Sequence, residues 1–169
     1  FYFLDNSSII NLIITLLVLL FFNLLNRLYL GDNGSYLLGF FYSLILVKFY
    51  INNISISPFF IILLLWYPGF ENLFSILRRF FRKKSLTQPD IKHLHQLVYD
   101  FFKKKYFFKN KILISNFPGF LIISYNFSVM LFSTFFIFNS KILLSIILFN
   151  IFLYCYLYNF LTKKNASKF

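Results

Sequence analysis

The chain is a succession of long apolar runs separated by short polar segments. Five of these runs have the length of membrane spans, at residues 9–25, 36–51, 58–77, 112–138 and 142–161. The runs are continuously apolar, which favours helices over the alternating strands of a membrane barrel. A helix crosses the bilayer core with about 20 apolar residues and satisfies its own backbone hydrogen bonds. The pattern predicts an all-α, polytopic integral membrane protein with about five transmembrane helices in a single transmembrane domain, residues 1–169.

The third run contains a helix-breaking pair, Pro68-Gly69, followed by a carboxylate, Glu71. Proline removes a backbone hydrogen bond and clashes with the preceding turn, so we expect the span to be broken at Pro68-Gly69. A carboxylate within a span is costly and indicates function. Two interpretations of Glu71 stay open: a functional residue, or a residue near the interface that pairs with Arg78 or caps the second half-helix.

Composition agrees with a membrane protein. Only 13% of the residues are charged and 59% are hydrophobic, whereas a soluble domain carries about 25% charged residues. The net charge of +12 admits nucleic acid as a partner, but the basic residues lie beside spans and no nucleic-acid recognition module is present. Attraction to membrane lipid explains the charge better. Cys155 lies within an apolar run, so no disulfide framework is expected.

The basic residues also predict an orientation. All of the 17 Lys and Arg except Lys48 and Lys141 fall in one set of alternate flanks. The positive-inside rule therefore places the segments 26–35 and 78–111 and the C-terminus in the cytoplasm. Two polar loops on one side of a membrane are what a shared active site requires.

The first cytoplasmic segment, 26–35, carries Asp32 between two glycines. Gly31 and Gly34 permit a tight turn, and Ser35 is placed to cap the following helix. The structural interpretation of Asp32 is an Asx-turn or a helix cap. The functional interpretation is a ligand for Mg²⁺, which takes one or two protein carboxylates together with substrate phosphates.

The second segment, 78–111, opens with a basic cluster that includes Arg78 and Arg79. Anchoring at the interface explains most of this charge, while an arginine fork also suits a phosphate. Pro89-Asp90 has the form of a helix start. The apolar residues that follow recur at helical spacing, which predicts a cytoplasmic amphipathic helix lying along the membrane surface.

Two histidines, His93 and His95, lie early on that predicted helix. On a helix they would diverge by about 200°, unlike the i, i+4 pair of a zinc helix, so no zinc site is expected. Without further information, two such residues are more often plain polar-face side chains.

Together these motifs resemble a known family. The run from Leu28 to Phe40, LYLGDNGSYLLGF, is followed by PGFENLFSILRR and PDIKHLHQL. Their order and their common side resemble the polyprenyl-phosphate N-acetylhexosamine-1-phosphate transferases, and the GlcNAc branch more than the phospho-MurNAc-pentapeptide branch. The last histidine of the family's Pro-Asp-x-x-His-x-His-His motif is replaced here by Gln96.

The resemblance implies a role for each motif. It assigns Asp32 to Mg²⁺, with Mn²⁺ as a substitute, and makes Asp32, His93 and His95 the catalytic set. The residues expected to bind substrate are Glu71, Arg78, Arg79 and Asp90. The family's adjacent-aspartate and Asn-rich motifs are not found, so we expect a C-terminal portion that does not catalyse the reaction alone.

The implied reaction transfers N-acetylhexosamine-1-phosphate, expected to be GlcNAc-1-phosphate, from a UDP-sugar to polyprenyl (undecaprenyl) phosphate and releases UMP. It would be the first membrane step of cell-envelope polysaccharide synthesis, in a bacterial inner membrane. The expected partners are the UDP-sugar, the polyprenyl phosphate and membrane lipid, with no nucleic acid and with a homodimer left open. The alternative is a non-catalytic membrane scaffold or a degenerate relative of the family.

Overall fold

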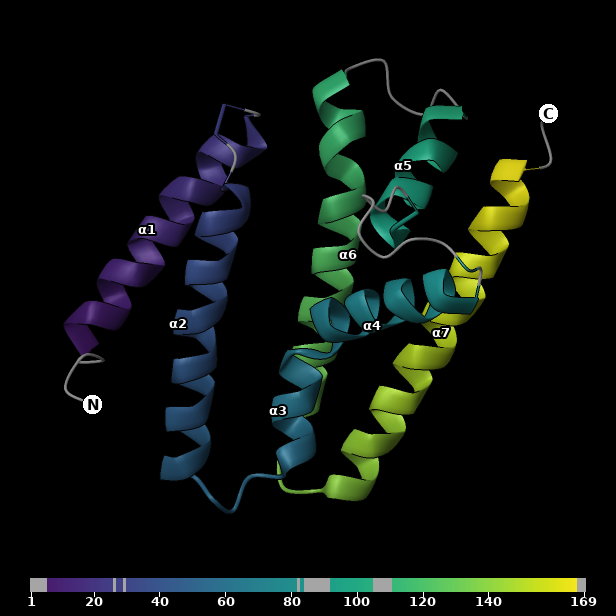
Figure 1. Ribbon diagram of the computed structural model, residues 1–169. Coiled ribbons are helices and arrows are strands. Elements are labelled where there is room, and N and C mark those ends of the chain that lie inside the picture. Colours follow the sequence, from purple (N-terminus) through teal and green to yellow (C-terminus); the bar gives the residue numbers. More distant parts are fainter. Residues whose placement is uncertain are drawn as a thin grey trace. The chain divides into compact units, whose positions relative to one another are not determined.

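The computed structural model describes residues 6–25, 27–28, 30–81, 83, 92–104 and 111–166. Within these ranges it contains seven helices and no strand (Figure 1). They are α1 (Asn6–Leu24), α2 (Gly31–Asn52), α3 (Pro58–Leu64), α4 (Trp66–Phe81), α5 (Leu94–Lys104), α6 (Lys111–Thr134) and α7 (Ser140–Ala166). The predicted all-α class is confirmed. The chain divides into two compact units, Phe1–Ile54 and Ser55–Phe169.

The first unit contains α1 and α2, and Leu20 of α1 and Leu38 of α2 line the same small pocket. Asp32 lies in the first turn of α2 rather than in a loop, because the helix already begins at Gly31. Gly31 has φ of +66°, so this glycine alone provides the turn before the helix. The predicted cap by Ser35 is wrong: its hydroxyl donates to the carbonyl of Asp32 over 2.8 Å, as a residue inside the helix does.

Three of the described helices are long and apolar enough to cross a membrane: α2, α6 and α7. The bent pair of α3 and α4 makes a fourth when the two count as one span. The predicted first span corresponds to α1, whose described apolar stretch, Ile10–Leu24, is shorter than these. Large apolar side chains are exposed along these helices, and such surfaces in a polytopic protein face lipid or other protein.

The third span is broken, as predicted, but at Leu65 rather than at Pro68-Gly69. The axes of α3 and α4 differ by 71°, and α4 runs across the direction of α6 and α7 (Figure 1). In a continuous helix the ring of Pro68 would clash with the carbonyl of Leu64, which is where α3 ends. The break therefore falls one turn before the proline, and Pro68 sits in the first turn of α4, where a missing N–H is tolerated.

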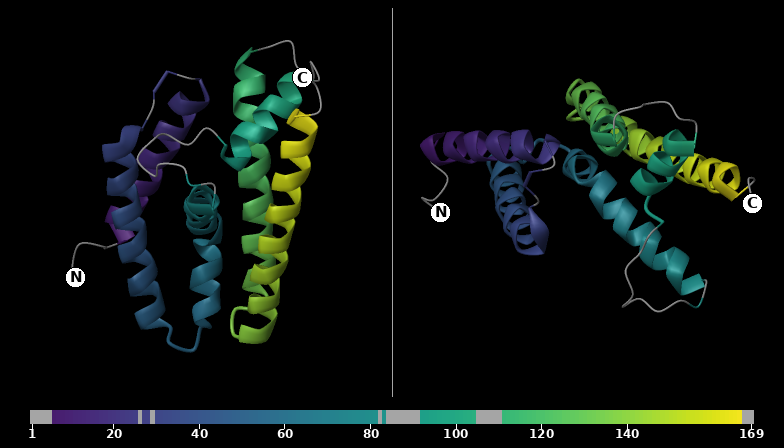
Figure 2. Two further views of the ribbon diagram at one scale, coloured as in Figure 1. Left: turned by 45° about the vertical axis from the view of Figure 1, so that its right-hand side comes forward. Right: turned by 90° about the horizontal axis from the view of Figure 1, so that it is seen from above.

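The start of α3 is fixed against the turn between α6 and α7. Ser57 caps α3 by accepting from the N–H of Phe59, and its hydroxyl lies 2.8 Å from that of Ser140. Above this contact, Leu63 and Leu143 are fully buried in one apolar cluster. These contacts define one end of the second unit, and α5 and the C-terminal part of α7 lie at the other (Figures 1 and 2).

The helix α5 is amphipathic, as predicted, and its apolar face packs against other side chains of the second unit. Leu94 and Leu97 are buried in a cluster with Trp66, Tyr154 and Leu161, and α5 packs against α6 and α7. Protein side chains thus cover Leu94 and Leu97 on the apolar face of α5. The predicted helix start at Pro89-Asp90 lies outside the described residues.

Candidate functional site

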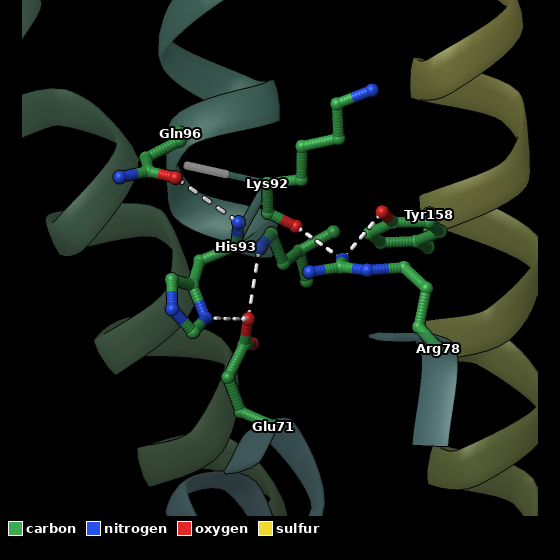
Figure 3. A network of polar contacts seen from close by, with 7 residues as sticks. Glu71, Arg78, Lys92, His93, Gln96 and Tyr158 are labelled. Carbon is green, nitrogen blue, oxygen red and sulfur yellow. Dashed lines mark hydrogen bonds and ion pairs between the residues drawn. The ribbon is translucent and has the colours of Figure 1, made fainter. Parts of the chain in front are cut away.

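A buried carboxylate joins α4 to the start of α5. Glu71 is only 8% exposed, and its Oε1 accepts two hydrogen bonds (Figure 3). One comes from the backbone N–H of Leu94 (2.9 Å) and the other from Nδ1 of His93 (3.1 Å). Leu94 is the first residue of α5, so the carboxylate satisfies an N–H that has no partner within the helix and lies at the positive end of the helix dipole. Glu71 therefore caps a helix, but that helix is α5 and not the second half-helix that the structural interpretation named.

A residue of α5 itself also caps the start of this helix. The side-chain Oε1 of Gln96 accepts from the backbone N–H of His93 over 3.1 Å, and the N–H groups of Gln96 and Leu97 donate to the His93 carbonyl. A glutamine that reaches back three residues to the residue before the helix forms half of a capping box. Gln96, the residue that departs from the family motif, therefore supports the position of His93.

The two histidine rings lie face to face. Their centroids are 5.7 Å apart and their planes differ by 8°. The predicted divergence of about 200° is wrong, because His93 precedes α5 and does not have to follow helical geometry. Desolvation, followed by the proximity of His93, lowers the pKa of His95, which favours its neutral ring. The structure thus brings both predicted histidines and Glu71 into one cluster.

The side chain of Arg78 connects the same region to α7. Its Nη1 donates to the carbonyl of Lys92 over 2.6 Å and to the hydroxyl of Tyr158 (Figure 3). The guanidinium also lies over the Tyr158 ring, 5.2 Å from the centroid, and 6.0 Å from that of Phe74. Arg78 therefore holds the residue before His93 against α7, a structural task beside the predicted phosphate-binding one.

Aromatic side chains surround the carboxylate. Phe70 and Phe74 of α4 pack edge-on against Tyr154 of α7, with centroids 5.1 Å and 5.2 Å away. Tyr67 and Tyr154 interact electrostatically with Glu71. No described residue, however, lies in hydrogen-bonding geometry with the second carboxylate oxygen of Glu71, Oε2. The carboxyl group therefore lies in a mainly apolar setting.

An apolar pocket of about 380 Å³ lies next to this cluster, between α4, α5, α6 and α7. Leu94, which donates its N–H to Glu71, lines it, as do Tyr67 and Tyr154. At its wall the indole N–H of Trp66 donates to Asn126 Oδ1 over 2.9 Å, which ties the start of α4 to α6. The pocket therefore offers almost only carbon surface, since Trp66 is bound to Asn126 and the hydroxyl of Tyr125 donates to Asn150.

The other predicted site residues lie outside this cluster. Asp32 is exposed in the first turn of α2, in the first unit, and Asp90 lies outside the described residues. Arg79 is partly exposed in the last turn of α4. Among the described residues, no three or more His, Cys, Asp or Glu side chains are arranged so that they could hold a metal ion. Asp32 can still provide one oxygen ligand for a hard cation, because Mg²⁺ usually completes its shell with phosphates and water.

Sequence reasoning missed three participants: the N–H of Leu94, Gln96 as a cap, and Tyr158 as the partner of Arg78. Only the second had a signal in the sequence, because Gln96 follows His93 at the spacing of a capping box. The other two depend on packing between elements far apart in the chain, which periodicity does not reveal.

Comparisons with known proteins point to one family. A stretch of 71 residues, 42% of this chain, is 35% identical to a protein of Thermotoga maritima described as an undecaprenyl-phosphate alpha-N-acetylglucosaminyl 1-phosphate transferase. A stretch of 76 residues, 44% of the chain, is 29% identical to a Bacillus subtilis protein described as a probable undecaprenyl-phosphate N-acetylglucosaminyl 1-phosphate transferase.

The matched stretches span 23% and 21% of the length of these two relatives. No protein-family model matches the chain, and no solved structure matches it. Both matches are to proteins described as N-acetylglucosaminyl 1-phosphate transferases, the kind of enzyme that the motifs around Asp32, Glu71 and His93 resemble.

Proposed function

We propose that the protein takes part in transferring N-acetylhexosamine-1-phosphate from a UDP-sugar to polyprenyl phosphate, with release of UMP. In the net reaction an oxygen of the lipid phosphate forms a bond to the sugar-bearing phosphorus. The bond from that phosphorus to the UMP oxygen breaks. GlcNAc-1-phosphate is the group we expect, since both relatives are described as N-acetylglucosaminyl 1-phosphate transferases.

The observation that carries the proposal is the cluster of Glu71, His93 and His95 at the start of α5. A histidine held by a buried carboxylate presents its other ring nitrogen in a fixed direction, which is what a group that orients a phosphate or moves a proton needs. Arg78 and Arg79 lie at the end of α4 and Lys92 just before His93, so basic charge surrounds the cluster. Both reactants are anions, and such charge lowers their mutual repulsion.

The apolar pocket supports the lipid acceptor. A polyprenyl chain needs carbon surface that reaches the polar site, and this pocket is lined by Leu94, whose N–H is bound to Glu71. A membrane-embedded acceptor and a water-soluble donor meet most readily at a membrane interface. The multi-pass helices and the basic residues beside the cluster suit that location.

We propose Asp32 as a ligand of Mg²⁺, with Mn²⁺ as a substitute. The exposed carboxylate in the first turn of α2 has the chemistry for this role. When bound, the cation would screen the charges of the donor pyrophosphate and stabilise the leaving UMP. The remaining ligands would be substrate oxygens, water and residues that the described chain does not bring to Asp32.

The test is release of UMP from UDP-GlcNAc by the complete natural protein, purified in detergent, with polyprenyl phosphate and Mg²⁺. The parent is expected to release UMP only when the lipid phosphate is present, and Asp32→Asn to lose most of that activity. Asn33→Ala, one position away, is the matched control and is expected to stay active. Activity unchanged in Asp32→Asn would remove Asp32 from the metal site.

Failure to release UMP from any UDP-N-acetylhexosamine, in a folded protein, would favour a non-catalytic scaffold. The same assay thus separates the transferase from its alternative. Release of UDP in place of UMP would also contradict the proposal, since it would mean that the sugar is transferred without its phosphate.

A further inference from the structure

One oxygen of Glu71 does two things at once. Its Oε1 accepts from the backbone N–H of Leu94 and contacts Nδ1 of His93, at 2.9 Å and 3.1 Å. An ionised carboxylate has no proton to donate, so a favourable contact at this distance requires that Nδ1 carries the hydrogen. With Nδ1 unprotonated, two lone pairs would face each other at the same distance.

The consequence lies on the opposite side of the ring. When Nδ1 carries the hydrogen and is bound to Glu71, Nε2 points away from the carboxylate, as the close-up shows (Figure 3). In the neutral ring, Nε2 is then the atom that accepts a proton or a hydrogen bond. A neutral histidine without such a partner prefers to carry its proton on Nε2, so the carboxylate would reverse the intrinsic preference.

The backbone of His93 is fixed from the other direction. Gln96 accepts from the His93 N–H, and Glu71 accepts from the next N–H in the chain. The ring and both adjacent backbone donors are therefore bound by side chains of α4 and α5. Because Glu71 lies after the bend of the broken helix, the same bond connects the bend to the histidine.

We propose that Glu71 is a positioning residue rather than a substrate ligand: it fixes His93 as the Nδ1–H tautomer and directs Nε2 toward the substrate. It does so through the oxygen that also caps α5. The tautomer rests on the contact between Glu71 Oε1 and His93 Nδ1 together with an ionised Glu71, and the direction toward substrate rests on the proposed function. Burial of Glu71 at 8% exposure agrees with a residue that acts through another side chain.

The tautomer can be measured directly. The chain contains only two histidines, so ¹⁵N-labelled histidine gives two ring systems, and His95→Asn assigns them. The spectra are recorded in detergent after the pH is raised until both rings are neutral. The expected result is that His93 carries its proton on Nδ1. A neutral His93 protonated on Nε2 would overturn the proposal without any variant.

Two substitutions test the cause. In Glu71→Ala the acceptor is gone, and His93 is expected to shift to the Nε2–H form, while Asn72→Ala, exposed on the same helix, leaves it unchanged. Retention of Nδ1–H in Glu71→Ala would overturn the proposal. Glu71→Gln keeps an oxygen that can accept both hydrogens, so it is expected to fold and to retain Nδ1–H even where the alanine variant does not fold. A shift of His93 to Nε2–H in the glutamine variant would contradict the role of Oε1 as the acceptor that fixes the tautomer.

The activity arm uses the complete protein and a double-mutant cycle. Misplacing a catalytic group costs about 10²-fold in rate, so Glu71→Ala is expected to lose about that much UMP release. In a His93→Ala background the same change should cost little, because the residue it positions is absent. Full additivity would contradict action through His93. If no variant and no parent releases UMP, the proposed function fails, while the tautomer measurement still decides the role of Glu71.

Discussion

At the scale of single residues, the account depends on a buried charge that is stabilised by particular donors. A carboxylate that leaves water loses a large hydration energy, and only hydrogen bonds or opposite charge recover it. For Glu71 the donors are the N–H of Leu94 and the ring of His93, more than 20 residues further along the chain. The sequence singled out Glu71 and His93 separately. It could not pair them, because nothing in either local pattern encodes how α4 crosses α5.

Tyr158 provides a test of the polar contacts around the site. It is 3% exposed and accepts a hydrogen bond from Arg78, which also binds the carbonyl before His93. Removing only the hydroxyl, in Tyr158→Phe, is expected to destabilise the protein by about 1–2 kcal/mol, because a hydrogen bond to a charged donor is lost. The measurement is the midpoint of thermal unfolding in detergent.

The matched control is Tyr156→Phe, since Tyr156 lies on the same helix and is 58% exposed. Its unfolding free energy is expected to change by no more than about 0.5 kcal/mol, as for ordinary surface substitutions, so its midpoint should stay close to the parent's. Equal midpoints for the two phenylalanine variants would show that the Arg78–Tyr158 bond adds nothing to stability.

At the scale of elements, the broken helix shows how far a local rule reaches. Proline predicts a break because its ring opposes the carbonyl four residues earlier, and Leu64 is indeed the last residue of α3. The position of the break was predicted one turn too late, because the prediction placed it at the proline itself. The size of the bend, 71°, follows from contacts that α4 makes elsewhere, and no sequence pattern contains it.

The substitution Pro68→Ala tests whether the bend between α3 and α4 is maintained by the proline or by tertiary contacts. Restoring the backbone hydrogen bond favours a straighter helix, but straightening would break the bonds from Trp66 to Asn126 and from Leu94 to Glu71. These two bonds, together with the contact between His93 and Glu71, outweigh the one bond that the restored N–H can form, each worth about 1 kcal/mol. We therefore expect the bend to remain in the variant.

Spin labels at Ile62 and Ile76 would measure the bend between α3 and α4, since these side chains lie on the two helices and are 50% and 52% exposed. Cys155 is replaced by serine beforehand, so that only the two introduced cysteines are labelled. An unchanged distance distribution between parent and Pro68→Ala is the expected result. A shift to longer distances would show that the proline alone maintains the bend.

The helix α5 illustrates the limit of periodicity. Its apolar face was predicted from the spacing, and Leu94 and Leu97 of that face are buried. Their protein neighbours, which include Trp66, Tyr154 and Leu161, were not predicted, because helical spacing identifies an apolar face without identifying what covers it. The same limit applies to α1 and α2: their apolar sequence predicts helices, but it does not show what packs against their exposed apolar side chains.

At the scale of the molecule, the basic residues are unevenly distributed between the two ends of the second unit. Lys141 lies beside the turn that holds Ser57, whereas Arg78, Lys104 and Lys164 belong to the opposite end, near the start of α5 and the end of α7. The orientation predicted from the basic residues would place this second end, with the candidate site, on the cytoplasmic side.

Cysteine accessibility tests that orientation in intact cells. In a chain with Cys155 replaced by serine, Ser140→Cys is expected to react with a membrane-impermeant maleimide added outside, because the α6–α7 turn would face outward. Lys164→Cys is expected to react only after the cells are permeabilised. The reversed pattern would place the cluster of Glu71 and His93 outside the cell, where a cytoplasmic UDP-sugar does not reach it.

The central claim is that the cluster at the start of α5 serves phosphosugar transfer, and its most direct test is UMP release by a histidine variant. The complete natural protein is assayed with UDP-GlcNAc, polyprenyl phosphate and Mg²⁺, alongside His93→Ala and the control Asn72→Ala. We expect the histidine variant to lose about 10²-fold or more in kcat while the control keeps the parent's rate. Release of UMP at the parent's rate by folded His93→Ala would contradict the account.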